Sequence, residues 1–315
     1  MNSTPEILFA PLQGYTEPEY RRAHHRIFGG VDMYYMPFVR LEHNILLKRD
    51  VRQLDESAGS DVPVTPQIIA SSPEEARTVI SEIQNRGFKS VNINMGCPFP
   101  PLAYHKKGAG ILPYPERVRE VLDAAFDAAQ GMELSVKMRL GWEEPAEAVR
   151  LLPIINTLPL ANVTMHPRLG KQGYKGEPDM EGFSYFYNEC AHPLYYNGDI
   201  LTSDHIAAII SRYPRLQGVM IGRGLLANPA LGLETKQGGT PMDYDQKIQA
   251  VKRLHDEYYR ACESRIQGGD LQIIRKMQAF WEYLLPEADR KAHKAIRKAS
   301  NLTAYHRAVN QLLAR

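Results

Sequence analysis

The sequence predicts an α/β protein, a (β/α)₈ barrel of the TIM type followed by a smaller all-helical region. Three observations predict it: short apolar runs recur eight times, amphipathic segments separate them, and the last part of the chain reads as helix alone. The repeating part occupies roughly 230 residues, close to the barrel size of about 250. A doubly wound open sheet is the competing architecture. No G-x-G-x-x-G follows the first run, which disfavours that alternative.

The apolar runs are short and bounded by polar or turn residues, as expected for buried strands. In chain order they are residues 7–11, 31–36, 64–70, 92–95, 134–139, 162–166, 194–197 and 218–222. Helices are predicted between them. Pro73 opens one, with Ser71 or Ser72 as its N-cap, residues 115–129 form another, and Thr202 begins a third.

The chain changes character after Asn228-Pro229. Gly238-Gly239-Thr240-Pro241 is typical of a turn or linker, and helical spacing continues from Asp243. We therefore expect a barrel domain over residues 1–240 and a helical domain over residues 241–315. Near the end, one acid, Asp289, is outnumbered by basic residues: Arg290, Lys291, Lys294, Arg297, Lys298 and Arg307. Such a face attracts phosphates, although a solvated helix surface explains it equally well.

The bulk composition is that of an ordinary globular protein, with 315 residues, 43% of them hydrophobic, and a net charge of +2. Cys97, Cys190 and Cys262 are too widely spaced for a zinc motif or a disulfide framework. We expect a cytoplasmic protein without metal. The N-terminus has no signal-peptide pattern, and no apolar run is long enough for a membrane span. We also expect a monomer.

One cysteine stands where a strand ends. Residues 92–98 begin with period-two alternation and finish in Gly96-Cys97-Pro98, which places Cys97 at the C-terminal end of a strand. A basic, glycine-containing loop, residues 106–110, follows. This combination suggests an anionic or nucleotide substrate, whereas a lone cysteine is more often structural.

Other predicted strands also bring polar residues to their C-terminal ends, where barrels hold their active sites. Lys137 is the most informative, because a lysine inside a strand needs an anionic partner or a lowered pKa unless its chain reaches solvent. His166 alone is more often a core histidine, and Arg168 alone a surface arginine. The full set is Pro11, Gln67, Asn94, Lys137, Arg139, His166, Arg168, Asn197, Gly198, Asp199, Gly222 and Arg223. The glycines after the last two strands expose backbone amides, which favours a phosphate-bearing cofactor.

These segments together resemble the tRNA-dihydrouridine synthases. The resemblance lies in the order and spacing of residues 10–14, 94–98, 108–110, 136–142, 166–168, 172–174, 197–200 and 221–224. It implies a flavoenzyme that uses FMN, with NADPH as reductant, to reduce the C5–C6 bond of a uridine in tRNA. It also implies that Cys97 is the general acid that protonates C5.

The resemblance assigns the remaining residues to two groups. FMN would be held by Ala10, Pro11, Leu12, Gln67, Lys137, His166, Asn197, Gly198, Asp199, Gly222 and Arg223. The substrate would be held by Asn94, Arg139, Arg168 and Tyr174, and the helical tail would bind the RNA backbone. The chain departs from the family pattern at Leu12, where Met is common, and at Asn92, where an acid is common. Residues 36–37 and 167–169 also differ.

Two other functions stay open at this point. One is a flavin-dependent barrel enzyme that acts on a small molecule such as a free pyrimidine. The other is a barrel that binds RNA without catalysis. Flavin colour and the effect of removing residues 243–315 would separate the three hypotheses.

Overall fold

The computed structural model describes residues 4–314. They form two compact units. The first extends to Pro11 and includes Asp32–Asp199 and Ile206–Ile221; the second comprises Leu12–Val31, Ile200–His205 and the chain from Gly222 onward. Helices α11 to α14, introduced below, fall in the second unit, and the domain boundary predicted at residue 240 stays a prediction.

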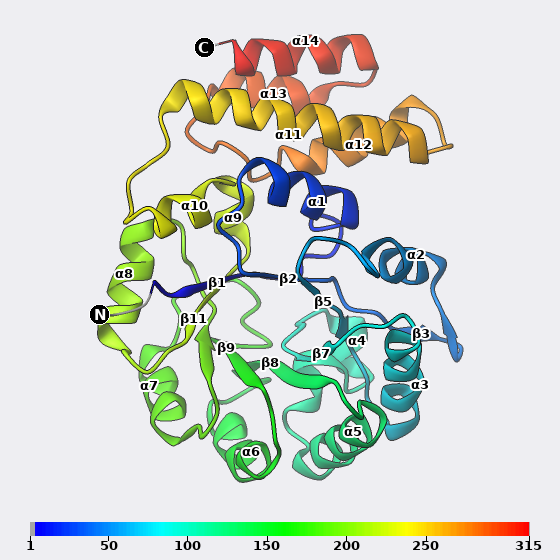
Figure 1. Ribbon diagram of the computed structural model, residues 1–315, viewed down its shortest axis with the longest axis vertical. Coiled ribbons are helices and arrows are strands. Elements are labelled where there is room, and N and C mark those ends of the chain that lie inside the picture. Colours follow the sequence, from blue (N-terminus) through cyan, green and yellow to red (C-terminus); the bar gives the residue numbers. More distant parts are fainter. Residues whose placement is uncertain (1–3, 315) are drawn as a thin grey trace. The chain divides into compact units, whose positions relative to one another are not determined.

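The first unit contains a nine-stranded sheet in which every neighbouring pair is parallel (Figure 1). The strands are β1 (Glu6–Phe9), β2 (Met33–Tyr35), β5 (Val64–Thr65), β6 (Gln67–Ile68), β7 (Ser90–Met95), β8 (Glu133–Gly141), β9 (Asn162–Leu169), β10 (Leu194–Tyr196) and β11 (Gly218–Ile221). Their order is β5-β2-β1-β11-β10-β9-β8-β7-β6. The two ends of this order, β5 and β6, are consecutive in the chain and separated only by Pro66. The sheet therefore closes into the predicted eight-membered barrel.

Pro66 divides the third predicted strand because proline has no N–H to donate to a sheet. Its carbonyl still accepts the N–H of Asn92 at 2.9 Å, so the backbone at Pro66 stays bonded to β7. A small separate hairpin, β3 (Leu41–Glu42) and β4 (Ile45–Leu46), follows β2 in the chain. Its turn residues His43 and Asn44 both have positive φ, as a tight hairpin turn requires.

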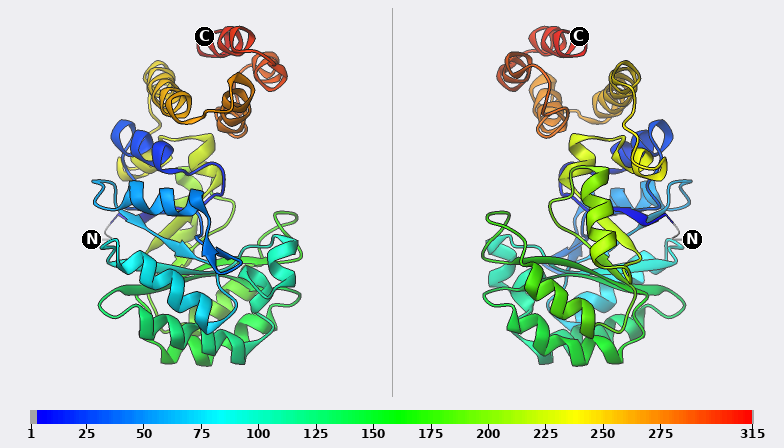
Figure 2. Two further views of the ribbon diagram at one scale, coloured as in Figure 1. Left: turned by 90° about the vertical axis from the view of Figure 1, so that its right-hand side faces the viewer. Right: turned by 90° about the vertical axis from the view of Figure 1, so that its left-hand side faces the viewer.

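Helices cover the outer face of the barrel (Figure 2). Their bounds are α2 (Lys48–Ser57), α3 (Pro73–Gln84), α4 (Pro100–Tyr104), the 3₁₀ turn η1 (Gly108–Ile111), α5 (Pro115–Ala128), α6 (Ala146–Thr157), α7 (Met180–Glu189) and α8 (Ser203–Arg212). Ser72 caps α3 through the N–H of Glu75, which confirms the predicted start of that helix.

The second unit is all-helical. It comprises α1 (Pro18–Ile27), α9 (Arg223–Ala227), α10 (Leu231–Lys236), α11 (Tyr244–Arg265), α12 (Asp270–Phe280), α13 (Arg290–Lys298) and α14 (Leu302–Leu313). Helix α1 packs on α11, where the Tyr20 and Tyr258 rings meet edge to face at 5.9 Å. Tyr305 accepts a hydrogen bond from Trp281 at 3.0 Å and pairs with His255 at 2.8 Å. None of the helices described in the two units has the length and hydropathy of a membrane span.

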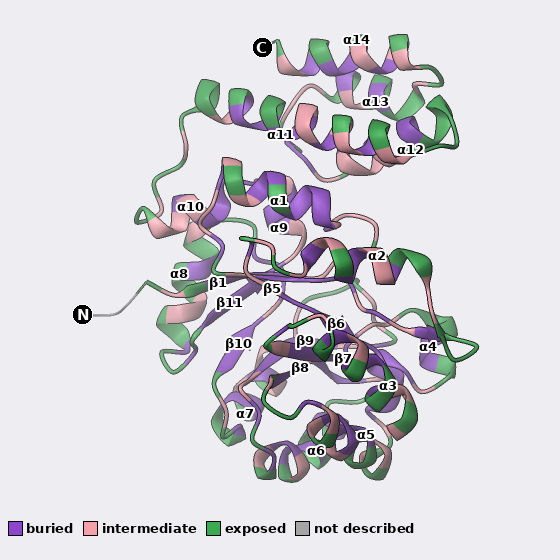
Figure 3. Ribbon diagram, turned by 45° about the vertical axis from the view of Figure 1, so that its right-hand side comes forward, coloured by how far each residue is buried: buried purple, intermediate pink, exposed green. Residues whose placement is uncertain are grey.

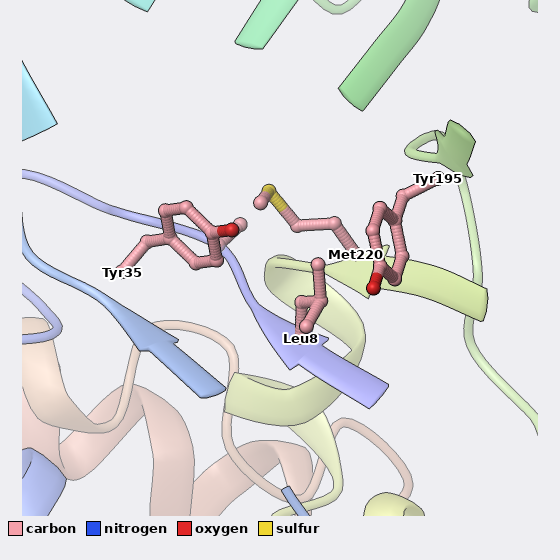
Figure 4. Packing of buried hydrophobic residues seen from close by; sticks show 5 residues of the cluster. Leu8, Tyr35, Tyr195 and Met220 are labelled. Atoms are coloured by element: carbon pink, nitrogen blue, oxygen red, sulfur yellow. The ribbon is translucent and has the colours of Figure 1, made fainter. Parts of the chain in front are cut away.

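The nine strands of the barrel sheet are buried along almost their whole length (Figure 3). On one side of the barrel interior the filling is apolar and aromatic. It consists of Leu8, Ala10, Tyr35, Tyr195 and Met220, contributed by β1, β2, β10 and β11 or the residue that follows (Figure 4). We call this group the apolar side.

Candidate functional site

The opposite side of the barrel interior is polar. Strands β7, β8 and β9 pair in register, which aligns Asn94 with Lys137 and Lys137 with Thr164. Because side chains alternate between the two faces of a strand, residues two apart share one face. The interior face of these strands therefore carries mostly polar side chains. They are Asn92, Asn94, Ser135, Lys137, Arg139, Asn162, Thr164, His166 and Arg168. We call this group, together with Gln67 of β6, the polar side.

A continuous chain of hydrogen bonds runs across the polar side. Asn92 Nδ2 donates to Ser135 Oγ at 2.8 Å, and Gln67 Nε2 donates to Asn92 Oδ1 at 2.7 Å. Asn94 Nδ2 donates to Gln67 Oε1 at 2.7 Å. These hydrogen bonds place Asn92 next to the candidate site, whereas the sequence alone marked Asn92 only as a departure from the family pattern. The signal was present: Asn92 lies two residues before Asn94, on the same strand face.

The end of this chain holds the backbone at Cys97. Asn94 Oδ1 accepts the N–H groups of Gly96 at 3.0 Å and of Cys97 at 2.8 Å. On its other side, the Cys97 carbonyl accepts the N–H of Ala109 at 3.0 Å. A Cβ on Gly108 would lie 2.6 Å from that carbonyl, so only glycine allows the approach. Cys97, which the sequence places at the C-terminal end of a strand, is thus held by Asn94 on one side and by Ala109 on the other.

The Cys97 side chain is half-buried and is a free thiol. Burial raises the pKa of Cys97, while the nearby charges of Arg139 and Lys137 oppose the rise. The thiol therefore holds its proton at neutral pH. Such a group is suited to give a proton rather than to attack as a thiolate.

Lys137 lies beside Cys97 on the neighbouring strand. Burial lowers the pKa of Lys137 to about 7, and the Arg139 charge adds to that effect. Its ammonium makes no hydrogen bond or ion pair with any residue from 4 to 314. Lys137 is half-buried, and an ammonium withdrawn from water without a partner is costly, so this position favours an anionic or hydrogen-bond-accepting ligand.

Arg139 joins two backbone segments. Its Nε donates to the Gly96 carbonyl at 2.9 Å, and its Nη1 donates to the Leu169 and Gly173 carbonyls at 2.9 and 2.7 Å. The guanidinium also lies over the Tyr174 ring, 5.5 Å from its centroid. Burial lowers the pKa of Arg139 to about 10. Arg139 therefore positions both the Cys97 turn and the Tyr174 loop, and its contact with substrate stays a prediction.

Arg168, which is predicted to bind the substrate, contacts Asp199, which is predicted to bind the cofactor. The pair is bidentate, with Arg168 Nη1 to Asp199 Oδ1 at 3.0 Å and a second bond between Nη2 and Oδ2. This ion pair raises the pKa of Arg168. Arg168 also lies 3.3 Å from His166 Nε2, and the rings of His166 and Tyr174 are 6.3 Å apart. The structure therefore brings residues of both predicted groups together.

The other predicted cofactor residues are spread over both units. In the first unit, the Ala10 N–H donates to the Ile221 carbonyl at 2.8 Å, and Asn197 Nδ2 donates to the Met220 carbonyl at 2.7 Å. Pro11 and Gly198 belong to the same unit. In the second unit lie Leu12, Gly222 and Arg223, the last two at the start of α9. Their shared role stays a prediction.

Comparisons with known proteins show the family to which the chain belongs. The model of the dihydrouridine synthase family matches residues 8–311. The tRNA-dihydrouridine(16) synthase of Neisseria meningitidis serogroup A is 27% identical over 283 residues, covering 86% of this chain and 84% of that protein. The probable tRNA-dihydrouridine synthase 2 of Bacillus subtilis is 29% identical over 262 residues, covering 81% and 79%.

Solved structures with the same barrel belong to more distant proteins. Morphinone reductase superposes with a TM-score of 0.55 at 12% identity, over 78% of this chain and 94% of that one. The old yellow enzyme from Trypanosoma cruzi gives a TM-score of 0.56 at 11% identity, over 80% and 93%. At this level of identity the likeness establishes the shared fold.

Proposed function

Because this chain belongs to the dihydrouridine synthase family, we propose that it is a flavin-dependent enzyme that reduces the C5–C6 bond of a uridine in tRNA. The relatives compared above carry names that refer to tRNA. The proposed reductant is NADPH and the proposed flavin is FMN. One observation carries the proposal: the Cys97 thiol is fixed by Asn94 at a strand end, beside a Lys137 ammonium that has no partner among residues 4–314.

The residues present fit a ring that is rich in carbonyl and amide groups, such as the isoalloxazine of FMN. The Lys137 ammonium needs an acceptor, and Thr164 Oγ1 is buried without a hydrogen-bond partner. Gln67 bonds Asn92 and Asn94 and keeps one amide N–H for a ligand. The residues proposed to hold FMN are Ala10, Pro11, Leu12, Gln67, Lys137, His166, Asn197, Gly198, Asp199, Gly222 and Arg223.

Cys97 is the proposed general acid. FMN, when bound, supplies the hydride for C6 of the uracil. The Cys97 Sγ–H gives its proton to C5, and its raised pKa keeps that proton in place until it is needed. Asn94 and Arg139 keep the Cys97 turn in position from opposite ends of Gly96.

The uridine would have to leave its stack in the RNA to reach Cys97. Tyr174 is 53% exposed and lies over Arg139, so its ring is suited to stack on an extruded base. Asn94 and Arg168 are the other residues proposed for the uracil. The basic residues of α13 and α14 are proposed to bind the RNA backbone through its phosphates.

Substitution of the thiol tests the proposal. Cys97→Ala is expected to keep the flavin absorbance and to oxidise NADPH, but to form no dihydrouridine in a transcribed tRNA. Cys190→Ala is the matched control, because Cys190 is also a free cysteine of the first unit and lies at the end of α7. Normal dihydrouridine formation by Cys97→Ala would remove Cys97 from the mechanism. A wild-type protein that shows no flavin absorbance would contradict the proposal that the enzyme is flavin-dependent.

A further inference from the structure

An exposed aromatic and basic surface lies on the segment that follows Cys97, and the mechanism above does not use it. Residues 97–115 contain no aspartate or glutamate, but they include His105, Lys106 and Lys107. In the same segment Phe99 is 54% exposed, Tyr104 is 85% exposed and Tyr114 is 41% exposed. We call Phe99, Tyr104, Lys106 and Tyr114 the aromatic platform. Three exposed aromatic side chains within one short segment are typical of an interaction site.

The aromatic platform stands on an ordered support. Helix α4 buries Leu102 and Ala103, and the Leu102 carbonyl accepts the N–H of Lys107 at 3.0 Å. The Lys107 ammonium bonds Glu75 of α3 at 2.5 Å, which ties the segment to the barrel. The turn η1 approaches closely, since a Cβ on Gly110 would lie 2.4 Å from the Ala103 carbonyl oxygen. The exposed rings are therefore presented by a packed turn.

Lys106 is held in an unusual backbone conformation. Its φ is +56°, in the left-handed region that residues other than glycine seldom adopt. This conformation accompanies an ammonium 4.1 Å from the centroid of the Tyr114 ring. Lys106 has no ion-pair partner in the part of the chain that the structure describes. Its charge is thus fixed over an aromatic ring without a carboxylate to neutralise it.

The aromatic platform adjoins the catalytic cysteine. Phe99 is two residues from Cys97, so their Cα atoms are at most about 7 Å apart. At its other end, the support contacts Cys97 directly through Gly108 and Ala109. Phe99, the first member of the aromatic platform, therefore lies next to the residue that the proposed reaction uses.

We propose that the aromatic platform binds single-stranded RNA nucleotides that flank the reduced uridine. Phe99 and Tyr104 stack on bases, and Lys106 contacts a phosphate. This inference rests on the proposed function, and it adds a binding site on the barrel to the helical surface considered above. The lack of acids over residues 97–115 favours a polyanion over a protein partner.

Another exposed tyrosine of the first unit shows the contrast. Tyr185 is 50% exposed and lines a groove with Leu140 and Val149. Asp179 and Glu181 line the same groove, so its charge repels phosphates. Exposure of a tyrosine alone does not predict RNA binding. Tyr104 differs from Tyr185 because it stands in a segment, residues 97–115, that has no acid of its own and carries the cation Lys106, which is unpaired among the described residues.

The test uses the full-length protein and a fluorescein-labelled single-stranded oligouridylate, with binding followed by fluorescence anisotropy. Tyr104→Ala is expected to weaken binding between about fivefold and a hundredfold, the effect of one lost base–aromatic stack. Tyr104→Phe keeps the ring and is expected to bind within about twofold of wild type. Tyr185→Ala, the matched control, is expected to bind as wild type does. Lys106→Gln is expected to reduce the slope of log Kd against log salt by about 0.7, whereas Tyr104→Ala leaves it unchanged.

The proposed RNA binding by the aromatic platform would be overturned if Tyr104→Ala bound as tightly as wild type, or if Tyr185→Ala lost as much affinity as Tyr104→Ala. Wild-type protein with no affinity for the oligouridylate would overturn it as well. The binding assay needs no turnover, so it is independent of the proposed reaction. If Tyr104→Ala loses binding while wild type forms no dihydrouridine, the platform stands and the proposed function falls.

Discussion

The two sides of the barrel interior follow the same strand geometry but have opposite chemistry. The apolar side is filled by Leu8, Ala10, Tyr35, Tyr195 and Met220. The polar side carries amides, cations and hydroxyls at equivalent interior positions of β6 to β9. Apolar filling stabilises the barrel mainly by burial, with the Tyr195 hydroxyl bonded to Glu6, whereas each buried polar group destabilises it unless it is hydrogen-bonded. The difference indicates that the polar side is maintained for chemistry rather than for stability.

One chain of side-chain hydrogen bonds on the polar side ends at the backbone of Cys97. Ser135, Asn92, Gln67 and Asn94 form one chain, whose last acceptor fixes the Cys97 N–H. Among residues 4–314, the Lys137 ammonium and Thr164 Oγ1 have no hydrogen-bond partner there. Within the described part of the chain, the five members of the apolar side form no such chain with one another, and the Tyr195 hydroxyl bonds Glu6 instead. Substitutions that make the two sides alike should therefore show how far stability and activity each depend on the polar side.

The largest effect is expected from Asn92→Leu, which places an apolar residue at the centre of the polar side. Gln67 and Ser135 would each lose a buried partner, so the free energy of unfolding is expected to fall by about 2–4 kcal/mol. Dihydrouridine formation is expected to fall about a hundredfold, because Asn94 and Cys97 lose their support. Denaturant unfolding and single-turnover kinetics measure the two effects.

Asn92→Asp is the control for that variant, because Asp keeps an acceptor for Gln67 and Ser135 can turn its hydroxyl to donate. It is expected to retain most of the activity. If Asn92→Leu were as stable and active as wild type, the hydrogen-bond chain would not position Cys97.

A gain of stability with a loss of function is expected from Lys137→Met. The two side chains have similar size, and the change removes a half-buried ammonium that has no partner among residues 4–314. A pKa lowered from 10.5 to about 7 sets an upper limit of about 4 kcal/mol on the gain for flavin-free protein at pH 7. Flavin affinity is expected to fall at least tenfold, measured by fluorescence titration. Lys106→Met, on an exposed turn, is the control and should change neither quantity. Unchanged flavin binding by Lys137→Met would contradict the assigned role.

The same lysine predicts a pH dependence of stability. Its folded pKa, about 7, lies below its unfolded pKa of 10.5, so the unfolded state binds more protons between these values. Stability of the flavin-free protein is therefore expected to rise between pH 7 and pH 9, by about 2 kcal/mol from this group. Lys137→Met should flatten the rise in denaturant unfolding series at the two pH values. A wild-type stability that falls over this range would contradict the lowered pKa.

The sequence was sufficient for the barrel, because each strand has its own apolar run and turn signals. All eight predicted runs lie in the sheet, and Pro66 divides only the third. The polar strand-end residues were also predicted, since period-two alternation places Lys137 and Arg139 on one face. Their partners could not be predicted. That Arg139 bridges Gly96 to Gly173, or that α1 packs on α11, depends on contacts between residues far apart in the chain. Local patterns carry no signal for such pairs.

The smallest effect is expected from Met220→Leu on the apolar side, and this variant is the reference against which the others are compared. Leu is similar in volume to Met, and well-packed cores tolerate such exchanges at a cost of less than about 1.5 kcal/mol. The bond that Met220 makes to Asn197 uses its backbone carbonyl, which the exchange leaves in place. Activity is therefore expected to stay within about twofold of wild type in steady-state assays. Met220 and Asn92 are both interior strand residues of one barrel, so burial alone gives no reason for different outcomes. If Met220→Leu impaired dihydrouridine formation as strongly as Asn92→Leu, general packing would explain both, and the polar side would lose its special relation to Cys97.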